Sequence, residues 1–213
     1  MAKSIVFVGL LLATVMVHNA AASDPDLTTD FNVTNPVAED FAFREFRNLQ
    51  APGKGVATPN FAQFNMKPPF VGLNGLGLAA VLFEFGPESQ IDPHTHPRAT
   101  EMFFVLSGEI QAGFVDTANN FFETTLYVGD IFVFPKGLLH FLHNNGKGTA
   151  SGFSALSSEN PGVLSVLKGL FTAGGTGFPD IVISTALGID AKHNEIDGLK
   201  AAVAFKNNVT LNW

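Results

Sequence analysis

Short apolar runs dominate the middle of the chain, from about Leu78 to Ser157. They are rich in Phe and Val, and Gly, Pro or Asn separates them at intervals of roughly ten residues. Such spacing is typical of the strands of an antiparallel sandwich or barrel. The runs are LAAVLFEF (78–85), EMFFVLSGEIQAGFV (101–115), FFETTLYV (121–128), DIFVFP (130–135), HFLHN (140–144) and ASGFSAL (150–156).

The segments on either side of these runs have a different texture. Residues 23–60 are polar and are interrupted by four prolines, which predicts an irregular arm on the domain surface. Beyond Pro161, apolar residues recur every three or four positions, as in amphipathic helices. We therefore expect a single, mainly β domain over 23–213, made of an N-terminal arm (23–60), a β-barrel (61–160) and C-terminal helices (161–213).

The first 22 residues are expected to be a secretory signal rather than part of the fold. Lys3 precedes an uncharged apolar run from Ile5 to Val17, and small residues follow at a cleavage site after Ala22. The run is too short for a membrane span, which needs about 20 apolar residues. The mature protein is thus predicted to be secreted.

Charge and composition narrow the possible partners. Removing the signal removes Lys3, so the formal net charge changes from −7 to −8. An acidic chain without basic clusters argues against nucleic acid or an anionic membrane as a partner. Only 15% of the residues are charged and 22 are Phe, more apolar surface than one small core readily buries. Burial between subunits, and hence a homo-oligomer, is the simplest expectation.

The segment PHTHPRATE (93–101) carries the strongest chemical signal. On a strand, His94 and His96 point to the same side, and Glu101 follows after a turn. A barrel can bring a distant strand, with His140 in GDIFVFPKGLLHFLHN (129–144), beside the first. Three imidazoles and one carboxylate suit a divalent transition metal. Ordinary half-buried polar residues are the alternative.

The segments 86–108 and 129–144 resemble the two signature motifs of the cupin superfamily, and PHTHPRATE with FPKGLLHF is similar to plant germins and germin-like proteins. The resemblance extends over essentially the whole mature chain. It implies a jelly-roll β-barrel, secretion to the cell wall or apoplast, one manganese ion per chain and a homohexamer built as a trimer of dimers. The implied metal ligands are His94, His96, Glu101 and His140.

Two departures from the family pattern affect the expectations. Family members usually carry a disulfide near the mature N-terminus, whereas this chain has no cysteine, so the arm is expected to be held by packing alone. The asparagines that hold the substrate in oxalate oxidases of the family align with Val81 and Ile91. Neither side chain can donate a hydrogen bond to oxalate.

Manganese-dependent superoxide dismutation is therefore the favoured function, because superoxide needs no elaborate pocket. A non-catalytic metal-binding protein of the cell wall, or one of receptor or storage type, is the alternative, and oxalate oxidase is disfavoured. His143 and His193 are not expected to be ligands. Two sequons, at Asn32 and Asn208, predict N-glycosylation.

Overall fold

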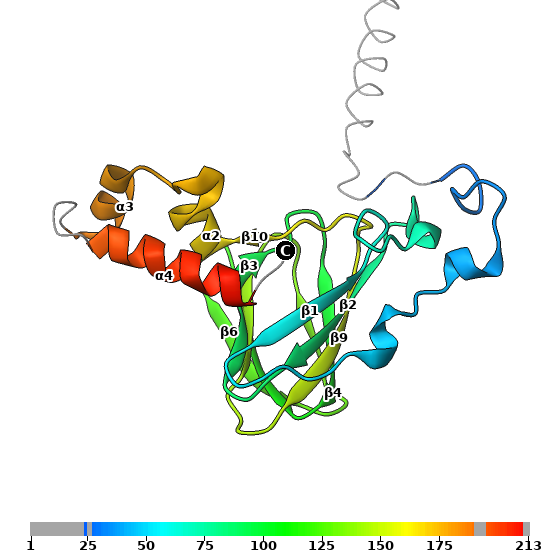
Figure 1. Ribbon diagram of the computed structural model, residues 1–213, viewed down its shortest axis with the longest axis horizontal. Coiled ribbons are helices and arrows are strands. Elements are labelled where there is room, and N and C mark those ends of the chain that lie inside the picture. Colours follow the sequence, from blue (N-terminus) through cyan, green and yellow to red (C-terminus); the bar gives the residue numbers. More distant parts are fainter. Residues whose placement is uncertain (1–23, 25–26, 190–194, 211–213) are drawn as a thin grey trace, which may run out of the picture.

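Two five-stranded antiparallel sheets face each other in the computed structural model, which describes residues 24, 27–189 and 195–210, with side chains as far as residue 204 (Figure 1). The sheet orders are β1-β2-β9-β4-β7 and β10-β3-β8-β5-β6. This architecture confirms the predicted jelly roll. The strands are β1 (Ala57–Ala62), β2 (Ala79–Phe85), β3 (Ser89–Thr95), β4 (Glu101–Ser107), β5 (Glu109–Val115), β6 (Phe121–Tyr127), β7 (Ile131–Phe134), β8 (Leu139–Asn144), β9 (Ala150–Leu156) and β10 (Leu164–Ser165).

The core lies between the two sheets and is built by strict alternation. Along β2 and β9, every second side chain is buried, as expected for strands with one face on a core. Three phenylalanines form the aromatic centre of the core. The ring centroid of Phe83 lies 6.0 Å from that of Phe85 and 5.8 Å from that of Phe103. The apolar runs therefore become strands because their alternation gives each sheet one continuous face to bury.

Strand β1 begins inside the segment that was predicted to be an irregular arm. Pro59 suggested a break, but β1 is the edge strand of its sheet and pairs only with β2. A proline is tolerated at an edge because no second neighbour needs its missing N–H. Strand β1 can therefore include Pro59, although a proline at this position had predicted irregular structure.

Gly108 connects β4 in one sheet to β5 in the other through a single residue. Its φ of +72° lies in the left-handed region that glycine adopts without strain. A Cβ at this position would also approach the Cβ of Ala150 to 2.6 Å. The abrupt passage between the sheets therefore requires glycine.

The N-terminal arm is anchored by hydrogen bonds as well as by packing, which corrects the expectation of packing alone. The Asp24 carboxylate accepts bonds from the Ser158 hydroxyl at 3.1 Å and from the Glu159 amide at 2.7 Å. Phe43 packs against Phe70 at 5.4 Å between ring centroids. Three 3-10 helices complete this region: η1 (Ala38–Phe41), η2 (Glu45–Asn48) and η3 (Val71–Leu73).

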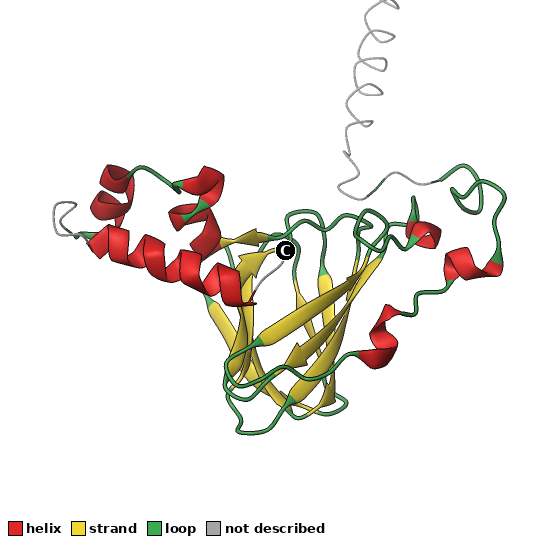
Figure 2. Ribbon diagram, viewed as in Figure 1, coloured by secondary structure: helices red, strands yellow, loops and turns green. Residues whose placement is uncertain are grey.

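The C-terminal helices lie together on one side of the barrel, opposite the arm (Figures 1 and 2). Their own small core contains Phe171, Ile183 and Ile196. Ser165 ends β10 and caps the next helix, because its hydroxyl accepts the Lys168 amide at 3.3 Å. No helix in the described part of the chain has the length and apolar character needed to cross a membrane. The elements are α2 (Val166–Phe171), η4 (Ala173–Gly175), α3 (Asp180–Leu187) and α4 (Glu195–Thr210).

Candidate metal centre

Neighbouring strands of one sheet place the histidines. His94 on β3 stands directly opposite His140 on β8, and their ring centroids are 4.2 Å apart. A register irregularity between Ile91 and His94 precedes this pair. His96 follows immediately after the end of β3, so its ring lies 5.0 Å from that of His94. The close spacing of the pair in the sequence thus becomes proximity in space.

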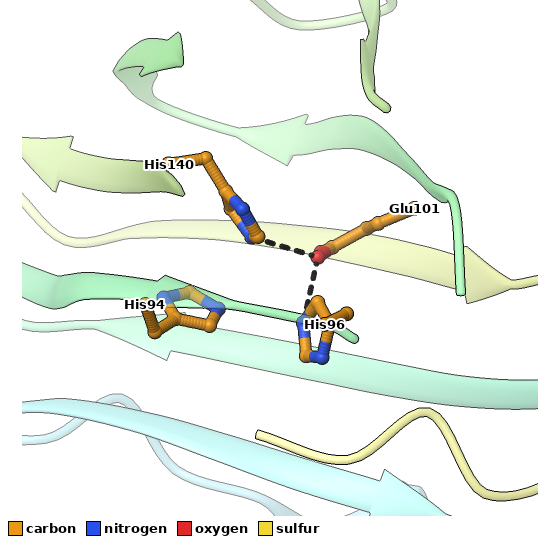
Figure 3. Close-up of side chains that lie close together, drawn as sticks. All are labelled: His94, His96, Glu101 and His140. Carbon is orange, nitrogen blue, oxygen red and sulfur yellow. Dashed lines mark ion pairs between the residues drawn. The ribbon is translucent and has the colours of Figure 1, made fainter. Parts of the chain in front are cut away.

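Glu101 reaches the same point from the other sheet. It is the first residue of β4, and its side chain is only 1% exposed. Figure 3 shows the carboxylate and the three imidazoles converging inside the barrel. Oε2 of Glu101 lies 3.0 Å from Nε2 of His96 and 3.4 Å from Nε2 of His140.

The four predicted residues therefore form one compact group. One donor atom from each lies within 4.8 Å of all the others, and all four side chains are buried. Among the described residues, no other group of this kind occurs. The set consists of His94, His96, Glu101 and His140.

Main-chain carbonyls orient all three imidazoles. Nδ1 of His94 lies 2.7 Å from the carbonyl of Asp92. Nδ1 of His96 is 2.6 Å from the carbonyl of Gly162, and Nδ1 of His140 is 2.8 Å from that of Leu138. Because a carbonyl only accepts, each Nδ1 must carry the hydrogen. In the neutral ring, Nε2 is then left with a lone pair available to a metal.

The centre contains buried atoms that lack a conventional hydrogen bond. They are Nε2 of His96, Nε2 of His140 and Oε2 of Glu101. With neutral rings, two nitrogen lone pairs face a carboxylate oxygen, and this contact is repulsive unless a proton or a cation lies between them. A buried polar group without a partner is costly. The donor set and its geometry therefore fit a divalent transition metal.

For two of the ligands, His94 and Glu101, the pKa values favour the protonation states that metal binding requires. Burial, followed by the neighbouring His140 and His96, lowers the pKa of His94 to about 3. Burial would raise the pKa of Glu101, but the close contacts of its carboxylate with His140 and His96 hold that pKa well below its usual range. Burial likewise opposes protonation of His96, yet the Glu101 carboxylate outweighs it and raises the pKa of His96. An ionised Glu101 and a neutral His94 are ready to bind.

The two positions that the resemblance aligns with the substrate-holding asparagines of oxalate oxidases are buried and apolar. Val81 is 1% exposed and Ile91 is fully buried, and both belong to the main core. Val81 stands opposite Ser154 in the register of β2 and β9. These side chains therefore present hydrocarbon, not amides.

Ser154 is a site residue that the sequence analysis missed. Its hydroxyl donates to Oε1 of Glu101 at 2.5 Å. The signal was available, because Ser154 is a polar residue on the inward-facing register of the run ASGFSAL.

Two other predicted positions, His143 and Asn32, are described and are not part of the centre. His143 is half-buried, and its Nδ1 is 3.1 Å from Oε1 of Gln111. Asn32 is exposed on the arm, while Asn208 falls in α4, beyond the described side chains. His193 lies outside the described residues.

Comparison with known proteins places these features in a family. Residues 59–195 match the family model described as Cupin. The chain is 33% identical to germin-like protein subfamily 2 member 2 of Arabidopsis thaliana, over 97% of this chain and 100% of the relative. It is 36% identical to germin-like protein 5-1 of Oryza sativa subsp. japonica, over 93% of this chain and 95% of that protein.

Solved structures show the same similarity. A structure of oxalate oxidase aligns with a TM-score of 0.72 and 27% identity, covering 86% of this chain and 99% of the other. Peruvianin-I, described as a cysteine peptidase from Thevetia peruviana latex, aligns with a TM-score of 0.62 and 28% identity, covering 68% of this chain and 98% of the other. The present chain has no cysteine, so it lacks the nucleophile of a cysteine peptidase.

Proposed function

Because this chain belongs to the cupin family and, within it, to the germin-like proteins, we propose that it is a secreted manganese-binding protein that dismutates superoxide. The observation that carries the proposal is the buried group of imidazole and carboxylate donors whose facing atoms need a proton or a cation between them. Ligand type alone suits several divalent ions, and intrinsic affinity disfavours manganese. Manganese is the ion that the family resemblance implies.

In the proposed reaction, two superoxide anions and two protons yield dioxygen and hydrogen peroxide. Manganese, when bound, would supply the one-electron oxidation and reduction that this reaction needs. His94, His96 and His140 would hold the ion through Nε2, and Glu101 would hold it through Oε2. Superoxide needs no hydrogen-bond donor from Val81 or Ile91, whose buried side chains are hydrocarbon.

The test is superoxide dismutation by the manganese-loaded protein in the presence of cyanide. We expect the wild type to be active, and we expect His140→Ala to lose both the metal and the activity. His143→Ala is the matched control, since His143 lies on the same strand but outside the centre. Manganese-loaded wild-type protein without cyanide-resistant activity would refute the proposal.

Oxalate oxidase is the second candidate, favoured by the structural similarity to that enzyme. An oxalate dianion needs hydrogen-bond donors around its oxygens, and an unpaired polar group in a closed site costs roughly 1 to 3 kcal/mol. Val81 and Ile91 supply none. We therefore expect no meaningful peroxide release from wild type with oxalate. Oxidation as fast as that of a Val81→Asn, Ile91→Asn double variant would reverse the ranking.

A non-catalytic metal-binding role in the cell wall is the remaining alternative. If the ion serves only to stabilise the fold, the metal-loaded protein should unfold at a higher temperature than the metal-free form and show no turnover. Equal melting temperatures would exclude a structural role for the ion. Comparing melting temperature and activity on the same preparations separates these two functions.

Secretion is the part of the proposal that concerns the N-terminus. The predicted signal, residues 1–22, lies outside the described residues. Expression of the full chain in a plant host should release a protein that begins at Ser23, as determined by N-terminal sequencing. A glycan on Asn32, which is exposed, would support passage through the secretory pathway.

A further inference from the structure

Ser154 is a polar residue in the middle of an apolar wall. It is fully buried on β9, the central strand of its sheet. Its register partners are Val81 on β2 and Phe103 on β4, and neither offers a polar side chain. A hydroxyl buried in this way needs a hydrogen-bond partner.

That partner is the carboxylate of the candidate metal centre. The Ser154 hydroxyl donates to Oε1 of Glu101 at 2.5 Å, the short distance expected when an ionised oxygen accepts. The other oxygen, Oε2, faces His96 and His140. The two carboxylate oxygens therefore have different partners. Oε1 accepts the hydrogen bond from Ser154, and Oε2 faces the two histidines.

Packing alone does not explain a serine at this position. The other inward-facing residues of β9 are Ala150, Gly152 and Leu156, all without polar side-chain atoms. An alanine would satisfy the same apolar neighbours without needing a partner. Packing of the core therefore does not require the Ser154 hydroxyl, whose role lies in its hydrogen bond to Glu101.

We propose that Ser154 is a positioning residue that fixes Glu101 as a one-oxygen ligand and reduces the electron density that this carboxylate donates to the bound ion. The inference rests on the proposed function, because it needs a metal at this centre. With Oε1 engaged, the carboxylate cannot rotate freely to offer both oxygens. Mutation of a residue that hydrogen-bonds to a metal ligand typically lowers the metal affinity by about 10- to 100-fold.

The experiment compares manganese binding by metal-free wild type, Ser154→Ala and Ser154→Thr. Calorimetric titration with Mn²⁺ gives the affinity, and the electron paramagnetic resonance spectrum of bound Mn²⁺ reports the ligand arrangement. We expect about 10- to 100-fold weaker binding and an altered spectrum for Ser154→Ala. Ser154→Thr, which keeps the hydroxyl, should restore both toward the wild type.

Ser89→Ala is the matched control. Ser89 is also buried and also donates one hydrogen bond, at 2.7 Å, but to the main-chain carbonyl of Gly86. The control should keep wild-type affinity and spectrum even if it melts at a lower temperature. Because affinity and spectrum are measured on folded protein, a general loss of stability does not imitate the expected result.

Two outcomes overturn different statements. Ser154→Ala with wild-type affinity and an unchanged spectrum would refute the role of Ser154 and leave the metal centre intact. A wild type that binds no manganese under the same conditions would refute the proposed function, and the role of Ser154 with it.

Discussion

His94 is a buried imidazole that stays neutral, and this makes the metal-free protein sensitive to acid. In the unfolded chain His94 titrates near its ordinary pKa of about 6.5, whereas burial and two neighbouring histidines lower its pKa in the folded protein to about 3. At a pH between these two pKa values, His94 is protonated in the unfolded chain and neutral in the folded protein. The stabilising contribution is therefore complete above pH 6.5 and is lost as the pH falls toward 3, by up to about 1.4 kcal/mol per pH unit.

Urea denaturation of the metal-free protein from pH 7 to 5 measures this effect. Staying above pH 5 avoids the loss of the Glu101 contribution, which lies at lower pH because the pKa of Glu101 is lowered. His96, whose pKa is raised, acts in the opposite sense, losing its contribution as the pH rises. His94→Leu should therefore lose less stability than wild type on acidification. Parallel pH curves for the two proteins would contradict the prediction.

Glu101 is the only anionic residue in the centre, so its charge should dominate metal retention. Glu101→Gln keeps the size of the side chain and removes the negative charge. We expect at least about tenfold weaker retention of manganese, measured as metal content after dialysis against a graded series of chelator concentrations. Glu84→Gln, a partly buried carboxyl on β2, is the control and should retain the ion. Equal metal content in all three proteins would remove Glu101 from the ligand set.

The residue types and spacing of the centre were accessible from the sequence, but its supporting contacts were not. Strand periodicity places His94 and His96 on one side, and the turn before Glu101 was also recognisable. The carbonyl acceptors carry no side-chain signature, because every residue has one. The bond from Ser154 to Glu101 joins residues 53 positions apart, so only the folded register brings them together.

At the scale of elements, the Asp24 carboxylate is one anchor of the N-terminal arm. Asp24 accepts two hydrogen bonds from the segment that leads to Gly162, whose carbonyl orients His96. Asp24→Ala should release the arm, at a cost of about 1 to 3 kcal/mol. Limited proteolysis should then cleave the arm faster than in wild type. Asp30→Ala, an exposed residue of the same arm, is the control.

An arm cleaved equally fast in both variants would show that Asp24 does not anchor it.

The same element shows where sequence patterns fail. Pro59 obscured an edge strand, because a sequence does not say which strands have only one neighbour. Asp24 and Glu159 are 135 residues apart, so no local pattern could pair them.

At the scale of the whole molecule, the chain exposes large apolar side chains, and the homohexamer remains a prediction. Ile181 and Leu187 on α3 are 67% and 55% exposed, and Val128 and Ile131 beside β6 and β7 are 63% and 56% exposed. Burying such side chains against a second copy of the chain would remove apolar surface from water. We expect the C-terminal helices to clasp neighbouring barrels, giving a trimer of dimers.

Light scattering on the untagged mature protein tests the assembly. A double change, Ile181→Asp with Leu187→Asp, should shift the protein to smaller species, because charge would be buried in the interface. Val37→Asp changes an equally exposed apolar residue on the arm and serves as the control. A reducing agent should leave the mass unchanged, since the chain has no cysteine. A monomeric wild type would refute the expectation.

The carbonyls that hold the three imidazoles also affect how the site can evolve. An acceptor supplied by the main chain survives almost any substitution at its own position, so Asp92 and Leu138 can change without disturbing ring orientation. Gly162 is the exception, because its φ of +68° is strained for any residue with a Cβ and the Arg98 guanidinium would have to shift to make room. Substitutions at positions 92 and 138 are therefore expected to have little effect on the metal centre. A deep mutational scan scored by metal retention should find positions 92 and 138 more tolerant of substitution than position 162.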